Sequence, residues 1–381
     1  MKIFLSFLQS LHQHPIPAYS FWEFYIKNGI EEAGHSWIEG EDIDWAKGLV
    51  PQSKEEHSRW LANSWEKTLA KMKIERPDVF LSYLYPQQID EQAIGEIRKL
   101  GIPCINFFCD NIREFQKIPK KFGVFDLNWV PEKEAIAMYK QAGINCIHLP
   151  MPMWVAPAYR TITITENSQI SFIGSFDIQR LLLFEELAKS NIPLVIYGSG
   201  WLTAPPVESP SKSSLHFQKK LNYQLQFVIK YGVKAYLRKL QQSNIDTSIS
   251  EPLKKSLRGK LDFGSYIRIS KDSLITLGVN RYPSFNYPLH HPNTYSRLRD
   301  IEAPMLGACY LTEAASGLAD LYEFGKDIEV YQDVNELVLK ANLLSKNASL
   351  RYSMRKNAQK IALAEHSIPR SIDKLLIKLK R

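Results

Sequence analysis

The feature that most constrains the fold is an alternation of short apolar segments with longer amphipathic ones. In the first 150 residues the segments expected as strands are "MKIFLSFL", "PDVFLSYLY", "IPCINFFCD", "FDLNWV" and "NCIHLP". Helices are predicted between them, over residues 17–33, 55–73, 89–100 and 132–142. Apolar strands that alternate with helices of this length are typical of βαβ units in a parallel sheet.

The alternation stops at residues 150–169, where three prolines lie close together, and then starts again. The strands expected after this linker are "QISFIGSF", "IPLVIYGSGW", "KDSLITLGVN", "CYLT" and "DIEVY". A helix is predicted over 177–190, another from Arg297, and an acid-rich one that ends at Gly325. The sequence therefore predicts an α/β protein with two Rossmann-like parallel-sheet domains that face a cleft.

The expected domain boundaries follow from this pattern. An N-terminal domain is predicted over 1–155 and a C-terminal one over 156–366. A helical insertion interrupts the second at about 202–270, and the segment 367–381 is expected to pack back on the first domain. A chain of 381 residues is long enough for two such cores.

The net charge and the cysteine content limit which partners and which cellular compartment are expected. The net charge of +8 suits a polyanionic ligand, an anionic membrane surface or a nucleic acid, but no nucleic-acid-binding motif accompanies it. The four cysteines show no zinc spacing, so we expect reduced thiols and no structural metal. "IFLSFLQSL" is better interpreted as a strand than as a signal peptide, and no apolar run spans a membrane, which predicts a cytoplasmic protein.

Candidate binding residues gather at the carboxyl ends of the second domain's strands, where ligands bind in such folds. Glycines let a backbone approach a ligand closely, and arginines can hold phosphate oxygens in bidentate fashion. A helical carboxylate can accept hydrogen bonds from sugar hydroxyls. The expected set for a nucleoside diphosphate comprises Gly174, Ser175, Arg180, Tyr197, Gly198, Trp201, Asn293, Thr294, Ser296, Arg297, Arg299 and Glu302. Each residue alone is most simply a turn or a solvated side chain, and only the ordered set indicates a site.

The quoted segments support a family resemblance. "FIGS", "IYGSGW", "RDIEAPMLGACYLTE" and "LYEFGKDIEVYQDVNEL" occur in the order found in GT-B fold glycosyltransferases, and most closely resemble the CgeB/YkvP-like group of spore proteins. "NASLRYSMRKNAQKIALAEHSI" is similar to that group's C-terminal helices. In the first half the resemblance is carried by "IPCINFFCDN" and "FDLNWVP".

This resemblance implies roles for individual residues. Glu302 matches the glutamate that holds the donor's ribose hydroxyls, and Arg299 the arginine near the diphosphate. Gly174, Ser175 and Arg180 match the positions that meet the donor phosphates, whereas Tyr197, Gly198 and Trp201 fall near the base pocket.

Two positions depart from the family pattern. Thr294 stands where many retaining GT-B enzymes carry a second glutamate, so retention does not follow. Pro304 lies inside the predicted helix, where it costs ~3 kcal/mol unless the helix kinks or has just begun.

The implied reaction moves a sugar from a nucleoside-diphosphate donor to a glycan, lipid-linked or protein acceptor, with no metal and no further cofactor. If the reaction inverts, a base from the first domain deprotonates the acceptor. Asp110, at a strand end, is the first candidate, followed by His12 and His14. Asp110 as the N-cap of a helix that starts at Asn111, and the histidines as plain loop residues, are alternatives that stay open.

Three other features are given simpler interpretations. "DID" at 42–44 imitates a metal motif of another glycosyltransferase fold, and His290 with His291 is expected to line a loop. Residues 214–242 predict a basic amphipathic helix. Packing of this helix on its own domain is favoured over docking on the anionic inner face of a membrane. A nucleotide-sugar epimerase and a non-catalytic nucleotide-sugar-binding or coat protein are the alternative functions.

Overall fold

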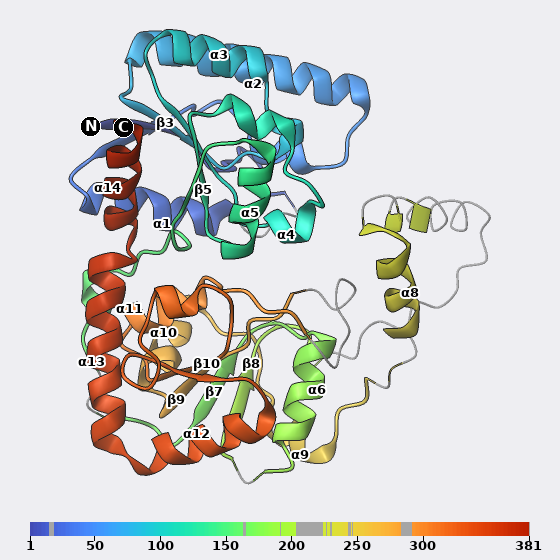
Figure 1. The fold of residues 1–381 in the computed structure, drawn as a ribbon, viewed down its shortest axis with the longest axis vertical. Helices are drawn as coiled ribbons and strands as arrows, with labels where there is room; N and C mark the ends of the chain where they lie inside the picture. The colour runs from blue at the N-terminus through green and yellow to red at the C-terminus, as the bar shows by residue number, and fades with distance from the viewer. Residues whose placement is uncertain are drawn as a thin grey trace. The chain divides into compact units, whose positions relative to one another are not determined.

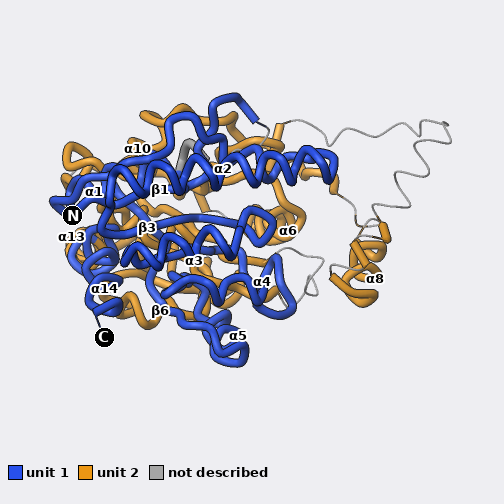
Figure 2. The backbone as a smooth tube through the Cα atoms, turned by 90° about the horizontal axis from the view of Figure 1, so that it is seen from above, with its two compact units in different colours: residues 1–155, 363–381 blue, residues 156–362 orange. Residues whose placement is uncertain are grey.

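The computed structural model describes residues 1–14, 19–162, 165–190, 192–202, 224–225, 227–228, 231–242, 245, 247–282 and 292–380 (Figure 1). The chain divides into two compact units, of which the first combines Met1–Val155 with Leu363–Arg381 and the second is Ala156–Ala362 (Figure 2). Each unit has its own sheet, of six and of five strands, and all the strand pairs in both are parallel. The predicted α/β class with two Rossmann-like sheets is confirmed.

Unit 1 has the strand order β2-β1-β3-β4-β5-β6. The strands are β1 (Lys2–Ser6), β2 (Ser36–Glu39), β3 (Val79–Ser82), β4 (Cys104–Phe107), β5 (Leu127–Val130) and β6 (Cys146–His148). The central strands β3, β4 and β5 are buried at every residue. Helices cover both faces of a parallel sheet, and this burial explains why these strands are continuous apolar runs rather than alternating ones.

The helices of unit 1 are α1 (Tyr19–Glu32), α2 (Lys54–Glu75), α3 (Glu91–Lys99), α4 (Asn111–Glu114), α5 (Lys133–Ala142) and α14 (Ile368–Leu379). Helix α2 starts with a capping box, in which Ser53 and Glu56 each accept from the other's backbone N–H. Helices α2 and α3 lie on one face of the sheet and α1 with α14 on the other (Figure 1). Gly29 of α1 lets α14 come close, because a Cβ there would lie 2.5 Å from the Ile368 side chain.

Unit 2 has the strand order β11-β10-β9-β7-β8. The strands are β7 (Ile170–Ile173), β8 (Leu194–Tyr197), β9 (Ile275–Gly278), β10 (Tyr310–Glu313) and β11 (Glu329–Tyr331). Its described helices are α6 (Ile178–Leu187), α8 (Val233–Gln242), α9 (Glu251–Ser256), α10 (Phe263–Asp272), α11 (Arg299–Met305), α12 (Val334–Lys346) and α13 (Ala348–Glu365).

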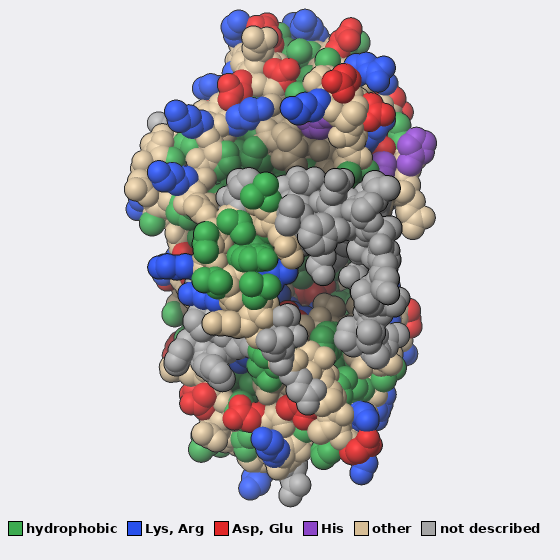
Figure 3. Space-filling view, turned by 90° about the vertical axis from the view of Figure 1, so that its right-hand side faces the viewer, with side chains coloured by type: hydrophobic (Ala, Val, Ile, Leu, Met, Phe, Trp, Pro, Cys, Tyr) green, Lys and Arg blue, Asp and Glu red, His purple; other side chains and the backbone are tan. Residues whose placement is uncertain are grey.

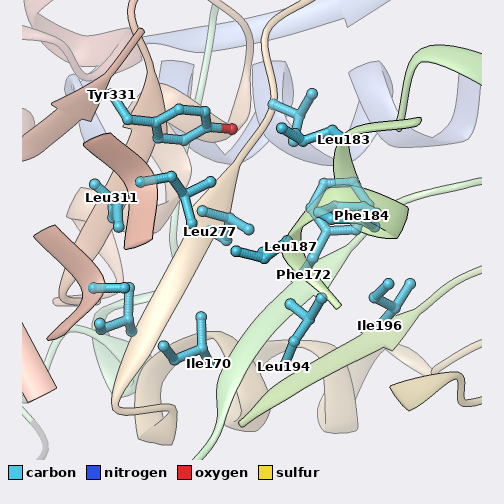
Figure 4. Close-up of a cluster of buried hydrophobic side chains, with 14 of the residues drawn as sticks. Ile170, Phe172, Leu183, Phe184, Leu187, Leu194, Ile196, Leu277, Leu311 and Tyr331 are labelled. Carbon is cyan, nitrogen blue, oxygen red and sulfur yellow. The ribbon is translucent and has the colours of Figure 1, made fainter. Parts of the chain in front are cut away.

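The core of unit 2 is a cluster of buried side chains between the sheet and its helices (Figure 4). Phe172 and Leu277 come from neighbouring strands, and Phe184 and Leu187 from α6. The rings of Phe172 and Phe184 pack with centroids 4.8 Å apart. This core fixes the ends of β7 and β9, from which the candidate binding residues project.

One predicted helix is wrong, and one strand is missing from the prediction. The acid-rich helix expected to end at Gly325 is a single 3-10 turn, Leu318–Asp320, because Gly317 precedes it with φ 87° and Asp327 accepts from the Glu323 N–H in a separate turn. Strand β2 was not expected at all. It is an edge strand whose four residues are exposed or half-buried, so it lacks the apolar signal of its neighbours.

The insertion is described in part. Its helices α8, α9 and α10 lie within 233–272, whereas residues 214–223 of the predicted basic helix, and His290 with His291, lie outside the described residues. No helix in the described part of the chain is long and apolar enough to cross a membrane.

Candidate functional site

A pocket opens in unit 2 where strands β7 and β9 end and α11 begins. Its volume is about 240 Å³. The lining residues are Phe172, Ile173, Gly174, Ser175, Arg180, Gly278, Val279, Asn280, Arg297, Leu298, Arg299 and Tyr310. Five of them, at 174, 175, 180, 297 and 299, belong to the set predicted from the sequence.

Arg180 shows the electrostatic character of this pocket. Its Nη1 donates to the Ser175 carbonyl at 2.7 Å, and its guanidinium lies 5.4 Å from the centre of the Phe172 ring. Burial, with the positive charges of Arg297 and Arg299 and against the opposing charge of Asp177, lowers the pKa of Arg180 to about 10. Three guanidinium groups thus share one small pocket and repel one another.

Arg297 is held by aromatic side chains. Its Nη2 donates to the Tyr295 hydroxyl at 2.7 Å and to the Arg281 carbonyl at 3.1 Å. The guanidinium stacks over the Tyr295 ring at 4.7 Å, and that ring stacks on Tyr282 with centroids 4.0 Å apart. No described residue accepts a hydrogen bond from its buried Nε. The side chain is therefore fixed in place with a donor left over.

Asp300, which is not in the predicted set, is bonded to residues that line this pocket. Its buried carboxylate accepts from the Arg297 backbone N–H at 2.7 Å, the Tyr310 hydroxyl at 2.8 Å and the Asn280 amide at 3.1 Å. Burial raises the pKa of Asp300, although these donors oppose the rise. Because three pocket-lining residues donate to it, Asp300 sets their relative positions. A carboxylate that can accept from a backbone N–H three residues earlier, just before a helix begins, is a capping signal that the sequence did contain.

Two glycines are required by close approach. A Cβ on Gly198, whose φ is 148°, would lie 2.1 Å from the Gly174 carbonyl oxygen. A Cβ on Gly278 would lie 2.2 Å from the Tyr310 hydroxyl. These glycines let the ends of β7, β8 and β9 crowd together around the pocket.

Glu302 is buried beside the pocket and does not line it. Only 2% of its surface is exposed, and its carboxylate accepts a hydrogen bond from the Tyr266 hydroxyl of α10. Arg299, one turn earlier, places its guanidinium 5.0 Å from the centre of the Tyr266 ring. Helix α11 is unbroken here, since Glu302 N–H donates to Leu298 and its carbonyl accepts from Leu306. Pro304 lies near the end of this seven-residue helix and leaves Glu302 in regular geometry.

Trp201 and Tyr197, which were expected near the base pocket, are not among the residues that line this pocket. Trp201 is 2% exposed, donates from Nε1 to the Gly174 carbonyl at 2.8 Å and packs on Phe176, so it belongs to the core. The Tyr197 hydroxyl reaches back to Gln169, which precedes the first residue of β7, and hence points away from the pocket. A residue's position at the end of a strand does not determine where its side chain points, so the sequence could not show the direction of either side chain.

The loop before α11 braces the site rather than lining it. Thr294 donates to the Ala314 carbonyl at 2.7 Å, and the Asn293 carbonyl accepts from the Tyr282 N–H at 2.9 Å. Ser296 is bonded to Asp300. None of the three is among the residues that line the pocket in the described part of unit 2.

In unit 1, Asp110 lies at the end of β4 and does not cap the helix that follows. Its side chain makes no capping bond. Glu132 takes that place, because its carboxylate accepts from the Asn111 N–H at 2.6 Å and the Ile112 N–H at 3.3 Å. Burial, with the nearby charge of Asp110 adding to it, raises the pKa of Glu132 to about 8. Asp110 thus stands at the N-cap position of this helix, as the simpler interpretation expects, but the capping bonds come from the Glu132 side chain.

The two histidines after β1 differ in their surroundings. His14 pairs its Nε2 with Asp44 at 2.9 Å, and Asp44, only 9% exposed, also accepts from Ser10 and from the Lys47 N–H. His12 is exposed, and its backbone N–H donates to the Ser10 hydroxyl oxygen at 3.2 Å. The geometry thus singles out His14.

The "DID" segment is split between two partners. Asp44 bonds to His14, whereas Asp42 pairs with Lys67 at 2.6 Å. Within the described ranges, no three His, Cys, Asp or Glu side chains gather in a group that could hold a metal ion. The prediction of a metal-free reaction stays a prediction.

A family comparison covers the half of the chain that holds the arginine pocket. Residues 180–377, just over half of the chain, match the profile of a family described as glycosyl transferase-like. The chain belongs to this glycosyl transferase-like family. The enzyme class predicted from the sequence, a glycosyltransferase, is confirmed, whereas the narrower CgeB/YkvP-like group is not established by this match. None of the curated proteins matches the chain.

Solved structures share the fold over the whole length of this glycosyltransferase. Sucrose-phosphate synthase from Thermosynechococcus elongatus has a TM-score of 0.55 at 12% identity, with 99% of this chain and 98% of that chain covered. A glycosyltransferase from Rickettsia africae has a TM-score of 0.57 at 12% identity, with 100% and 97% covered. Anabaena HepE in complex with UDP has a TM-score of 0.54 at 12% identity, with 99% of each chain covered. These likenesses confirm the predicted GT-B fold.

Proposed function

We propose that this glycosyltransferase takes its sugar from a nucleoside-diphosphate donor whose diphosphate binds in the arginine pocket. The observation that carries the proposal is the crowding of Arg180, Arg297 and Arg299 into about 240 Å³, with the pKa of Arg180 lowered by burial and by the other two. Such a cluster is unfavourable when empty, and an anion with several oxygens relieves the repulsion. Anabaena HepE, which shares the fold, binds UDP and UDP-glucose and supports this donor class.

The pocket residues would act mainly on the leaving group. As the glycosidic bond breaks, the anomeric carbon gains oxocarbenium character and the diphosphate gains negative charge. Guanidinium groups and the first N–H groups of α11 stabilise the negative charge that develops on the diphosphate. Because these groups supply positive charge there, we propose a metal-independent reaction. Arg299 is assigned to the diphosphate and Glu302 to the ribose hydroxyls, as the resemblance to the CgeB/YkvP-like group implies.

For an inverting reaction we propose His14 as the base that deprotonates the acceptor. Its Nε2 is paired with Asp44, whose carboxylate is itself fixed by Ser10 and the Lys47 N–H, so the imidazole has a defined orientation. Asp110 remains the other candidate at the ends of the unit 1 strands. Replacing His14 by Ala should lower turnover about 10²–10⁴-fold with unchanged donor affinity, and Asp110→Asn is the matched comparison. An equal loss in both variants, or a loss only in Asp110→Asn, contradicts the assignment.

We further propose that α8 brings the enzyme to an anionic membrane surface, which suits a lipid-linked acceptor. Val233, Leu237 and Leu240 are exposed at helical spacing, and Lys234 and Arg238 flank them. Viewed from the side on which α8 lies, Figure 3 shows hydrophobic side chains gathered with Lys and Arg side chains beside them. Co-sedimentation with phosphatidylglycerol vesicles, but not with phosphatidylcholine vesicles, is expected. It should be lost in Leu237→Asp, and equal binding by that variant contradicts the proposal.

The donor class is tested by thermal shift against UDP, GDP, CMP and dTDP sugars. Stabilisation grows with ligand concentration over the dissociation constant, so the correct nucleotide should stand out. A transfer assay with an acceptor then distinguishes a glycosyltransferase from an epimerase and from a binding protein. An epimerase would convert the donor without an acceptor, and a binding protein would show affinity with no turnover. If none of these nucleotides raises the melting temperature, the donor assignment is wrong.

A further inference from the structure

A tyrosine of the insertion is bonded to the glutamate proposed to bind ribose. Tyr266 lies on α10, 36 residues before Glu302, and its hydroxyl donates to the Glu302 carboxylate. Burial raises the pKa of Tyr266, with Glu302 adding to the rise and Arg299 opposing it, so the hydroxyl stays protonated and acts as the donor. The resulting bond joins an O–H group to a carboxylate oxygen, which is the bond a ribose hydroxyl would make.

The position of this bond relative to the pocket matters. Arg299 lines the pocket, and its guanidinium lies 5.0 Å from the centre of the Tyr266 ring. Glu302 follows Arg299 by three residues on the same helix, so the two side chains project from one face. A ribose attached to a diphosphate in the pocket would therefore arrive where Tyr266 and Glu302 meet. Glu302 is 2% exposed, so a ribose reaches the carboxylate only when Tyr266 moves.

We propose that Tyr266 occupies the ribose subsite of the nucleotide-free enzyme and has to release Glu302 before a ribonucleoside diphosphate binds fully. This inference rests on the proposed function, in which Glu302 receives the ribose. Binding then exchanges one hydroxyl for another at the same carboxylate, and such an exchange contributes little net free energy. Tyr266 thus sets how strongly the enzyme prefers ribose over deoxyribose.

Tyr266→Phe tests this in the full-length protein. The variant keeps the ring beneath Arg299 but leaves the buried Glu302 carboxylate without the tyrosine hydroxyl, which penalises the free enzyme. Ribose hydroxyls relieve that penalty, so affinity should rise about tenfold, the factor equivalent to ~1.4 kcal/mol. The melting temperature without ligand should fall. Calorimetry with UDP, GDP, CDP and ADP, and with their 2′-deoxy forms, measures both affinity and ribose preference.

The controls separate the possible outcomes. Tyr352→Phe, on an exposed position of α13, should change neither quantity. In Tyr266→Phe combined with Glu302→Gln the gain should vanish, because residue 302 no longer carries a charge.

Two negative results have different meanings. Unchanged or weaker affinity in Tyr266→Phe, with a wild-type enzyme that binds a nucleotide, overturns the inference alone and makes Tyr266 a structural support. A wild-type enzyme that binds none of the nucleotides overturns the proposed function as well.

Discussion

Replacing Arg180 by Met is predicted to stabilise the free enzyme while weakening its hold on the donor. Burial, and then the charges of Arg297 and Arg299, lower the pKa of this guanidinium to about 10. That fall corresponds to ~3 kcal/mol against the charged form. Since the folded-state pKa lies below that of the unfolded chain, the full penalty acts below pH 10 and disappears as the pH rises through the folded-state pKa toward that of the unfolded chain.

The net gain is smaller than this penalty. Methionine loses the 2.7 Å bond from Arg180 to the Ser175 carbonyl, a bond from a charged donor that contributes ~1.5–3 kcal/mol. A net stabilisation of up to ~1.5 kcal/mol remains, which raises the melting temperature by up to about 6 °C for a unit of this size. The affinity for a nucleoside diphosphate should fall about 10–100-fold, because one charge-assisted contact to phosphate is gone.

The assay is a thermal melt at pH 7.5 with and without UDP, GDP, CDP and ADP, together with calorimetry. Arg268→Met, an exposed arginine of α10 outside the pocket, is the matched control and should leave both quantities unchanged. A variant that is less stable than wild type and binds the nucleotide equally well would refute the reasoning, because Arg180 would then be a structural residue rather than a strained anion ligand.

The remaining predictions concern a glycine and a buried carboxylate. Gly198→Ala should lower the melting temperature and the nucleotide affinity, since its Cβ would lie 2.1 Å from the Gly174 carbonyl, whereas Gly259→Ala, with open space around it, should do neither. Glu132 has a pKa raised to about 8, so the folded state keeps a proton that the unfolded chain loses, and stability should fall as the pH rises from about 4.5 to 8. Glu132→Gln should flatten the melting temperature measured across that range, and an unchanged slope would contradict the cause given for it.

Much of the fold could be predicted from the sequence because each buried strand carries its own apolar signal. Strands β3, β4 and β5 are continuous hydrophobic runs, and the glycines at 101 and 143 end helices where positive φ is needed. Strand β2 was not predicted, because an edge strand that is only half-buried needs no such hydrophobic run. The helix expected before Gly325 does not form, because the glycine at 317 and the bond from the Glu323 N–H to the Asp327 carboxylate favour turns over helix.

The site could be predicted only as far as strand order determines it. Arg180, Arg297 and Arg299 converge because their segments follow neighbouring strands of one parallel sheet. Tyr266 could not be found this way, since its contact with Glu302 depends on how α10 packs in three dimensions. The burial of Trp201 could not be predicted for the same reason, because it depends on the path of the chain after β8.

The most direct test of the central claim is a crystal structure of the enzyme with a bound nucleoside diphosphate. We expect the two phosphates to lie among the guanidinium groups of Arg180, Arg297 and Arg299, with the ribose at Glu302 and the Tyr266 hydroxyl withdrawn from that carboxylate. Phosphates bound away from all three arginines would contradict it.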